Sequence, residues 1–149
     1  MKRKTIINLS VIFAVVMGTM ACGTSLVIQD VDYSQPLESV LTPDADNRVH
    51  DQRYAIKFSI IPVLQEEGIT SVDEIRVIRN RAGYYFITAS GFSHVYVFEP
   101  DESVLKLKNK IEIAGEGLGQ PAFNQRNTHI ELVDMISGQS YNIDQNGRR

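Results

Sequence analysis

The chain has a single cysteine, Cys22, among its 149 residues. One cysteine excludes an internal disulfide, and an unpaired cysteine in an exported protein needs another explanation. The three histidines, His50, His94 and His129, form no HxH, HxxxH or HxxE pattern. Because a zinc site needs three or four ligands in a tetrahedral array, the sequence predicts no metal ion, and it predicts no other cofactor.

Positive charge is also scarce, since the chain has a net charge of −3 at pH 7. Three of its 15 basic residues lie together within the first four positions. The remaining 12 are set against 18 acidic residues, which leaves a net charge near −6 outside this short basic head. Contact with phosphates requires concentrated positive charge, so the composition argues against a nucleic-acid partner.

Residues 1–25 have the three parts of a secretory signal peptide. A basic head at residues 2–4 is followed by an unbroken apolar run from Val11 to Met17. Small residues then surround Cys22. The apolar run must enter a bilayer while the basic head stays on the cytoplasmic side, so the sequence predicts an exported protein.

The end of this leader resembles the signal of bacterial lipoproteins, in which a cysteine follows a small residue. Ala21 and Cys22 match the last two positions of that motif, and Gly23 is acceptable after them. Thr19 and Met20 depart from the usual Leu-Ala or Leu-Ser. The resemblance implies that Cys22 becomes the new N-terminus and carries a fatty acid such as palmitate on its sulfur. It further implies a protein anchored to a membrane of the bacterial cell envelope, on its periplasmic or surface side.

Two other interpretations of the leader remain open. Thr19 to Ala21 also fits the small-x-small cleavage site of ordinary secretion, which would release a soluble protein. Without cleavage, the uncharged run from Thr5 to Gln29 is long enough to span roughly 30 Å of hydrocarbon as a helix. The lone cysteine favours the lipoprotein interpretation, because lipidation gives Cys22 a role.

Composition and periodicity divide the chain into three segments. Residues 1–21 are the predicted signal peptide, and residues 22–50 are predicted to be a lipidated N-terminus with a flexible tether. The tether contains Pro36 and Pro43 and has no sustained hydrophobic period, so it buries too little apolar surface to offset its ordering entropy. Residues 51–146 are predicted to form a single β-rich domain.

The predicted domain begins with apolar and polar residues that alternate over 54–60, which favours a half-buried strand. Pro62 suits the start of a helix and Gly68 its end, so a short helix is predicted near 62–67. Short connections between strands force antiparallel neighbours. The predicted fold is therefore mainly β, an antiparallel meander forming an open sandwich or a small barrel. Its further strands are predicted at 74–80, 84–90, 94–99, 104–113, 128–135 and 140–144.

The segment 104–113 has the clearest alternation in the chain. Its pattern predicts one buried apolar face and one solvated face of charged residues, with Asn109 marking a bulge or a local exit from the core. The apolar face would hold Leu105, Leu107, Ile111 and Ile113, and the solvated face Lys106, Lys108, Lys110 and Glu112.

The strand–turn–strand rhythm of residues 74–121 resembles one blade of an NHL-type β-propeller. A closed propeller needs at least four blades of about 40 residues each, so a chain of this length cannot form one alone. The sequence also has no internal repeat.

The glycine-containing loop predicted at 115–127 is a candidate site for recognising a ligand or partner. Phe123 would supply an apolar contact there, and Gln125, Arg126 and Asn127 would supply polar ones. Aromatic residues on neighbouring strands offer a second candidate, a platform for sugars or peptides. It would use the outward-facing members of the group Tyr84, Tyr85, Phe86, Tyr96 and Phe98.

No catalytic constellation is evident, so the sequence favours a non-enzymatic binding or accessory module with an envelope protein or a glycan as partner. An alternative is a small envelope hydrolase that uses His94 or His129 with a carboxylate such as Glu99 or Glu131. A third interpretation is a subunit of a larger assembly, with an exposed sheet edge paired to another chain.

Overall fold

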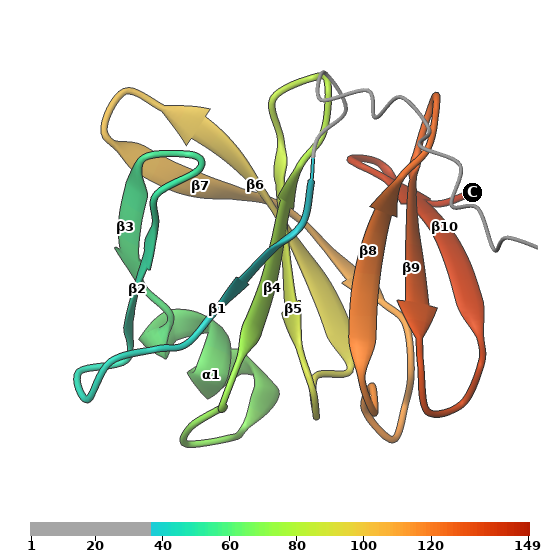
Figure 1. The fold of residues 1–149 in the computed structure, drawn as a ribbon, viewed down its shortest axis with the longest axis horizontal. Helices are drawn as coiled ribbons and strands as arrows, with labels where there is room; N and C mark the ends of the chain where they lie inside the picture. The colour runs from blue at the N-terminus through green and yellow to red at the C-terminus, as the bar shows by residue number, and fades with distance from the viewer. Residues whose placement is uncertain (1–36) are drawn as a thin grey trace, which may run out of the picture. The chain divides into compact units, whose positions relative to one another are not determined.

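A computed structural model of the chain describes residues 37–149 (Figure 1). The predicted signal peptide, Cys22 and the first part of the predicted tether lie outside these residues. Within 37–149, no helix is both long and apolar enough to cross a membrane. The elements are β1 (Ser39–Leu41), β2 (Arg48–Asp51), β3 (Ile56–Ser59), α1 (Ile61–Glu67), β4 (Ile75–Arg79), β5 (Tyr85–Ala89), β6 (His94–Asp101), β7 (Val104–Glu112), β8 (Pro121–Gln125), β9 (Ile130–Asp134), β10 (Ser140–Asp144) and β11 (Gly147–Arg148).

The strands form three antiparallel sheets. A central five-stranded sheet has the order β1-β4-β5-β6-β7, and a C-terminal four-stranded sheet has the order β11-β10-β9-β8. Strands β2 and β3 form a separate two-stranded hairpin. These sheets and the one short helix confirm the predicted fold class, an antiparallel and mainly β meander, and the described part of the chain does not close into a barrel.

Both faces of the central sheet are buried, which gives a three-layer arrangement (Figure 1). On one face the β2–β3 hairpin and α1 cover a core that includes Val49, Leu64, Ile87 and Tyr96, here called core A. On the other face the C-terminal sheet covers core B. Its members include Phe86, Val95, Ile111, Phe123 and Leu132.

Strand β5 is buried at every position because consecutive side chains point into the two different cores. Tyr85 contributes to core A and Phe86 to core B. Tyr96 is also buried, with 1% of its surface exposed. The predicted platform is therefore not exposed as a whole: Tyr85, Phe86 and Tyr96 are buried, and the other two members, Tyr84 and Phe98, are half-buried.

A bulge in β7 changes which side chains share a face. The pairing with β6 shifts between Val97, opposite Asn109, and Phe98, opposite Leu107. Leu107 thus points to the same side as Phe98, toward core A, whereas Ile111 belongs to core B. The predicted bulge near Asn109 is confirmed, but the single apolar face predicted for 104–113 is wrong, because the extra residue reverses the alternation.

The β domain extends beyond both predicted boundaries. Strand β1 pairs with β4 through Ser39 and Val77, and Val49 in β2 is 1% exposed in core A. These residues lie within the predicted tether of 22–50. Strand β11 adds to β10 after residue 146. The early strands have only three and four residues, too few to give a recognisable period.

The loop between β7 and β8 packs against the β5–β6 turn. Gly91 donates its N–H to the Leu118 carbonyl at 2.8 Å, and Leu118 donates to the Phe92 carbonyl at 2.8 Å. At Gly117, φ is +85°, and a Cβ atom would lie 2.8 Å from the Gly91 carbonyl oxygen. Only glycine fits this contact, since real Cβ atoms do not approach backbone so closely.

We predict that Gly117→Ala destabilises the protein more than Gly138→Ala. Both positions have positive φ, but a Cβ at Gly138 would meet nothing within 4 Å. The Gly138 variant should lose about 1 kcal/mol from backbone strain alone, and the Gly117 variant a further 1–3 kcal/mol, roughly, from the clash. Urea unfolding of both variants measures the difference. Equal losses would show that the loop does not need this close contact.

Candidate functional site

An apolar groove of about 710 Å³ lies between the β2–β3 hairpin and the β6–β7 hairpin. One wall is β3 with the first turn of α1, the floor is β5, and the other wall is the far half of the β6–β7 hairpin. The groove is lined by residues 55–59, Pro62, Val63, Tyr85, Ile87, Phe98, Pro100, 102–105 and Leu107.

The β7 bulge builds the second wall of the groove. Because it places Leu105 and Leu107 on the same side as Phe98, three apolar side chains face the β2–β3 hairpin. The hairpin does not cover all three, since Leu107 is 54% exposed. Val104, which also lines the groove, is 53% exposed. Large apolar residues gathered at the surface often mark a binding site.

Charged groups in the groove are few and unpaired. Lys57 lines the β3 wall and Glu102 the opposite wall, and neither forms an ion pair with any residue of 37–149. Apolar walls with a small number of polar groups are typical of ligand sites. The groove could therefore hold an apolar segment and orient it through one or two charges.

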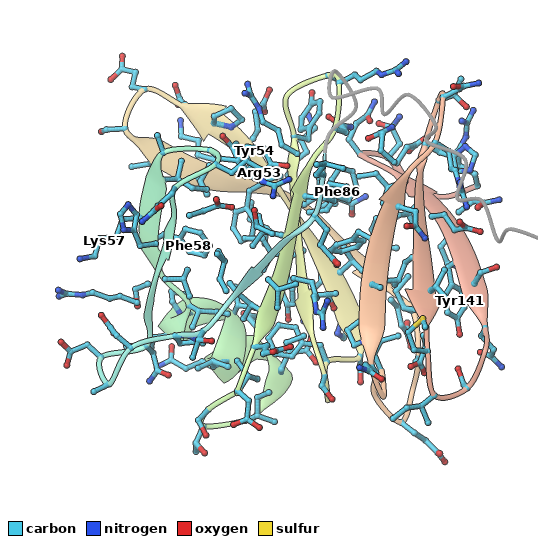
Figure 2. The ribbon with its side chains drawn as sticks, viewed as in Figure 1. Arg53, Tyr54, Lys57, Phe58, Phe86 and Tyr141 are labelled. Carbon is cyan, nitrogen blue, oxygen red and sulfur yellow. The ribbon has the colours of Figure 1, made fainter. Side chains whose placement is uncertain are left out.

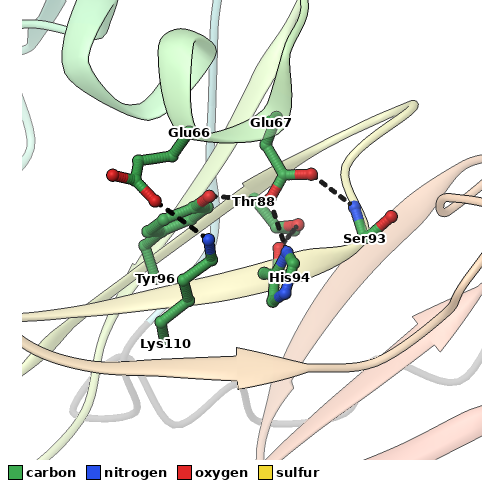
Figure 3. Close-up of polar contacts among 7 residues, drawn as sticks. All are labelled: Glu66, Glu67, Thr88, Ser93, His94, Tyr96 and Lys110. Carbon is green, nitrogen blue, oxygen red and sulfur yellow. Dashed lines mark hydrogen bonds and ion pairs between the residues drawn. The ribbon is translucent and has the colours of Figure 1, made fainter.

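A buried carboxylate, that of Glu67, fixes the helix that closes one end of the groove (Figure 3). Helix α1 has Pro62 in its first turn and is capped by Gly68, where φ is +70°. Glu67 is its last residue, with a side chain only 3% exposed. Its oxygens accept hydrogen bonds from the Ser93 N–H at 2.8 Å and the Tyr96 hydroxyl at 2.7 Å, and they lie 2.8 Å from His94 Nδ1.

These contacts determine the protonation of the Glu67 cluster, which comprises Glu67, Ser93, His94 and Tyr96. Burial alone raises the pKa of Glu67, but the hydrogen bonds from Ser93, Tyr96 and His94 outweigh it and hold the pKa below its usual value. Burial raises the pKa of the Tyr96 hydroxyl, and the neighbouring Glu67 carboxylate raises it further. Glu67 is therefore an anionic acceptor, and Tyr96 a neutral donor, at neutral pH.

The same cluster bears on the predicted histidine–carboxylate pairs. His94 contacts Glu67, on α1, rather than Glu99. Glu99 lies opposite Lys106 in the β6–β7 ladder. The sequence could not reveal the His94–Glu67 pair, because these residues are 27 positions apart and belong to different elements.

The second predicted pair, His129 with Glu131, is not formed. His129 Nδ1 lies 3.4 Å from the Thr128 hydroxyl, while Glu131 forms an ion pair with Arg126. Among residues 37–149, no group of three or more His, Cys, Asp or Glu side chains could hold a metal ion.

The four residues predicted to recognise a ligand lie in strand β8 and the turn after it, away from the groove. Phe123 and Gln125 belong to strand β8, which begins inside the predicted loop. Phe123 is 4% exposed within core B, so its ring is not accessible to a partner, and its N–H donates to Glu38 at 2.8 Å. Gln125 donates to the His129 carbonyl at 3.1 Å, and Arg126 pairs with Glu131. Asn127 is exposed in the turn that follows, and none of the four lines the groove.

A second cavity, of about 530 Å³, lies near the β9–β10 turn and has a more polar lining. Its one cationic side chain, Arg76, is already paired with Glu38 at 3.2 Å and with Glu74 at 3.1 Å. Because its only cation is engaged by two carboxylates and its lining is more polar than that of the groove, this cavity offers a ligand less than the apolar groove does.

Comparison of the chain with protein-family models, with curated proteins and with solved structures finds no match. What the groove and the Glu67 cluster do must therefore be argued from their own geometry. The accessible apolar walls suit the groove for binding, and the contacts of Glu67 suit the cluster for holding α1 on the central sheet.

We predict that Glu67→Gln lowers the free energy of unfolding by about 2–3 kcal/mol, because hydrogen bonds to a charged acceptor are lost. The amide also places a donor against at least one of the three donors around it. The control is Glu66→Gln, whose carboxylate is 60% exposed and pairs with Lys110 at 3.0 Å. That variant should lose less than about 1 kcal/mol. Urea unfolding at pH 7 compares the two.

Comparison of Glu67→Gln with the natural protein also tests the pH dependence of unfolding. The pKa of Glu67 in the folded protein lies below its usual value of 4.5, so its contribution is complete above pH 4.5. This contribution is lost as the pH falls through the folded pKa. The difference in unfolding free energy between the natural protein and Glu67→Gln should therefore shrink on acidification. A difference that stays constant below pH 4.5 would contradict the assignment.

Proposed function

We propose that this chain is a lipid-anchored, non-enzymatic binding protein of the bacterial cell envelope, which holds an apolar segment of a partner in the groove. The observation that carries the binding role is the accessible apolar groove, with Val104 and Leu107 each more than half exposed. Support for the anchor comes from the leader sequence, which ends in Ala21 and Cys22.

The physical case for binding rests on the cost of leaving these side chains in water. Burying a leucine that is now exposed stabilises a complex by about 1.5–3 kcal/mol at most. Phe98, Leu105 and Leu107 form a continuous apolar wall, so their contributions would combine in one contact. A partner held this way needs no concentrated positive charge, in keeping with the acidic composition of the chain.

A small envelope hydrolase is the alternative, and the His94–Glu67 contact is the one observation in its favour. That pair supplies a base and the group that orients it, but hydrolysis also needs a nucleophile or an activated water. Two hydroxyls beside the pair are already engaged: Thr88 donates to the His94 carbonyl and Tyr96 donates to Glu67. These contacts favour a structural role for the pair.

The anchor is tested by Cys22→Ser. We expect the variant to move from the membrane fraction to the soluble fraction and to lose labelling by radioactive palmitate, because no thiol is left to acylate. The control is Ser25→Ala, which keeps the cysteine and should stay at the membrane. A Cys22→Ser protein that remains membrane-bound with residues 1–21 attached would support the uncleaved helix instead.

The groove is tested by a photoreactive phenylalanine analogue placed at Leu107 or, as a control, at Lys108. Both residues are exposed and adjacent on β7, but only Leu107 lines the groove. On irradiation of intact cells, position 107 should give a discrete adduct whose cross-linked peptide mass spectrometry can identify. The same adducts from both positions, or none from 107, would contradict binding in the groove.

A further inference from the structure

We infer that the apolar groove takes an extended peptide, which adds as a strand to the free edge of β3. This inference rests on the proposed function and names the class of ligand that the groove would take. Strand addition of this kind gains affinity from backbone hydrogen bonds and specificity from alternate side chains.

The edge of β3 is open to the groove. Strand β3 pairs only with β2 among the described residues, so one of its edges has no neighbouring strand. Every residue of 55–59 lines the groove. A strand that bordered the groove with one face would contribute only alternate residues. The groove therefore runs along the backbone edge of β3 as well as along its side chains.

The pairing of the hairpin reveals which backbone groups point outward. Ile60 donates its N–H to the Asn47 carbonyl at 2.9 Å, next to the ladder that pairs Val49 with Phe58. Hydrogen-bonded and non-hydrogen-bonded pairs alternate along an antiparallel ladder. Ile56 and Phe58 therefore direct their N–H and C=O groups toward β2. Lys57 and Ser59 direct theirs away from β2.

These outward groups have no backbone partner within residues 37–149. Unpaired N–H and C=O groups along a strand edge form a template for another strand. An incoming segment would form hydrogen bonds with the N–H and C=O of Lys57 and Ser59, while its own side chains alternate between the two faces.

The two faces of β3 determine which side chains of the ligand are apolar and which are charged. In Figure 2, Phe58 points toward the central sheet and Lys57 points away from it. Alternate side chains of the ligand would lie beside Phe58 and face the apolar wall of Leu105 and Leu107. The intervening side chains would lie beside Lys57, which has no ion-pair partner among the described residues. Opposite charges on neighbouring strands attract, so the ligand is apolar at alternate positions with acidic residues between them.

A second copy of this chain fits the same edge less well. If two β3 edges joined about a two-fold axis, both Lys57 side chains would lie on the same face of the joined sheet, opposite or diagonal to each other. Like charges at such positions are destabilising. A lipid chain would fill the apolar wall but leave the outward backbone groups of β3 without partners. The charge and the open edge together therefore favour a peptide of another protein.

The test uses the full chain in lipid nanodiscs and a fluorescein-labelled heptapeptide, Ser-Val-Glu-Val-Glu-Val-Ser. Fluorescence anisotropy should detect binding. Two control peptides should bind at least about tenfold more weakly, since they lose the alternation or the hydrogen bonds. One is the reordered Ser-Val-Val-Val-Glu-Glu-Ser, and the other is the alternating peptide with N-methyl groups on its backbone.

Protein variants test the same contacts from the other side. Lys57→Pro removes the outward N–H and should reduce affinity for the alternating peptide by about tenfold or more. Lys57→Ala keeps the N–H and should cost only a few-fold. Lys57→Glu should instead prefer a peptide with lysine in place of glutamate. If Lys57→Pro fails to fold, the N-methylated peptide tests the same hydrogen bonds with the natural protein.

The outcomes separate this inference from the proposed function. Equal binding of the alternating, reordered and N-methylated peptides would overturn strand addition, as would failure of the alternating peptide to bind. Either result would leave the groove intact as a binding site if the adduct still forms at Leu107. Loss of that adduct would instead overturn the proposed function itself.

Discussion

The structure depends on one constraint, the need to cover both faces of the central sheet. Strand β5 has no charged or amide side chain, and all of its residues are buried. Such a strand is stable only between two other layers, because consecutive side chains point to opposite faces. The C-terminal sheet covers core B, and the β2–β3 hairpin with α1 covers core A. The groove and the structural role of Glu67 both follow from how completely each of these layers covers its face of the sheet.

The two covers differ in extent, and the difference creates the groove. The C-terminal sheet is a regular four-stranded layer, whereas the other cover is a two-stranded hairpin and a helix of seven residues. The smaller cover leaves the far half of the β6–β7 hairpin partly open, where the β7 bulge turns Leu107 toward it. Glu67 compensates for the small size of this layer, because three hydrogen-bonding contacts fix α1 to β6 and to the residue before it. The layer formed by the β2–β3 hairpin and α1 is thus held in place at α1 and open along the free edge of β3.

Sequence patterns predicted the elements with strong periodicity and missed those without it. The short helix and the strands from β4 to β7 were predicted because alternation and turn residues define them locally. Strands β1, β2 and β8 were missed for different reasons. Strand β1 has three residues and pairs with the distant β4, and β2 has only four residues. Strand β8 begins at Pro121, inside a segment whose glycines indicated a loop. The groove was missed for a related reason. A single extra residue in β7 decides whether Leu107 is buried or accessible, and only the pairing with Phe98 reveals it.

The pairing of β1 with β4 has a consequence for the order of folding. Ser39 lies opposite Val77, so this pair closes a loop that contains the whole β2–β3 hairpin and α1. The strands from β4 to β10 instead pair with their immediate neighbours in the chain, apart from the separation between the two larger sheets. Contacts between distant residues form late, because a larger loop entropy must be lost first. Residues 37–67 are synthesised before β4, so we expect β1 to dock only once β4 has been made, and core A to stay exposed to aggregation until then.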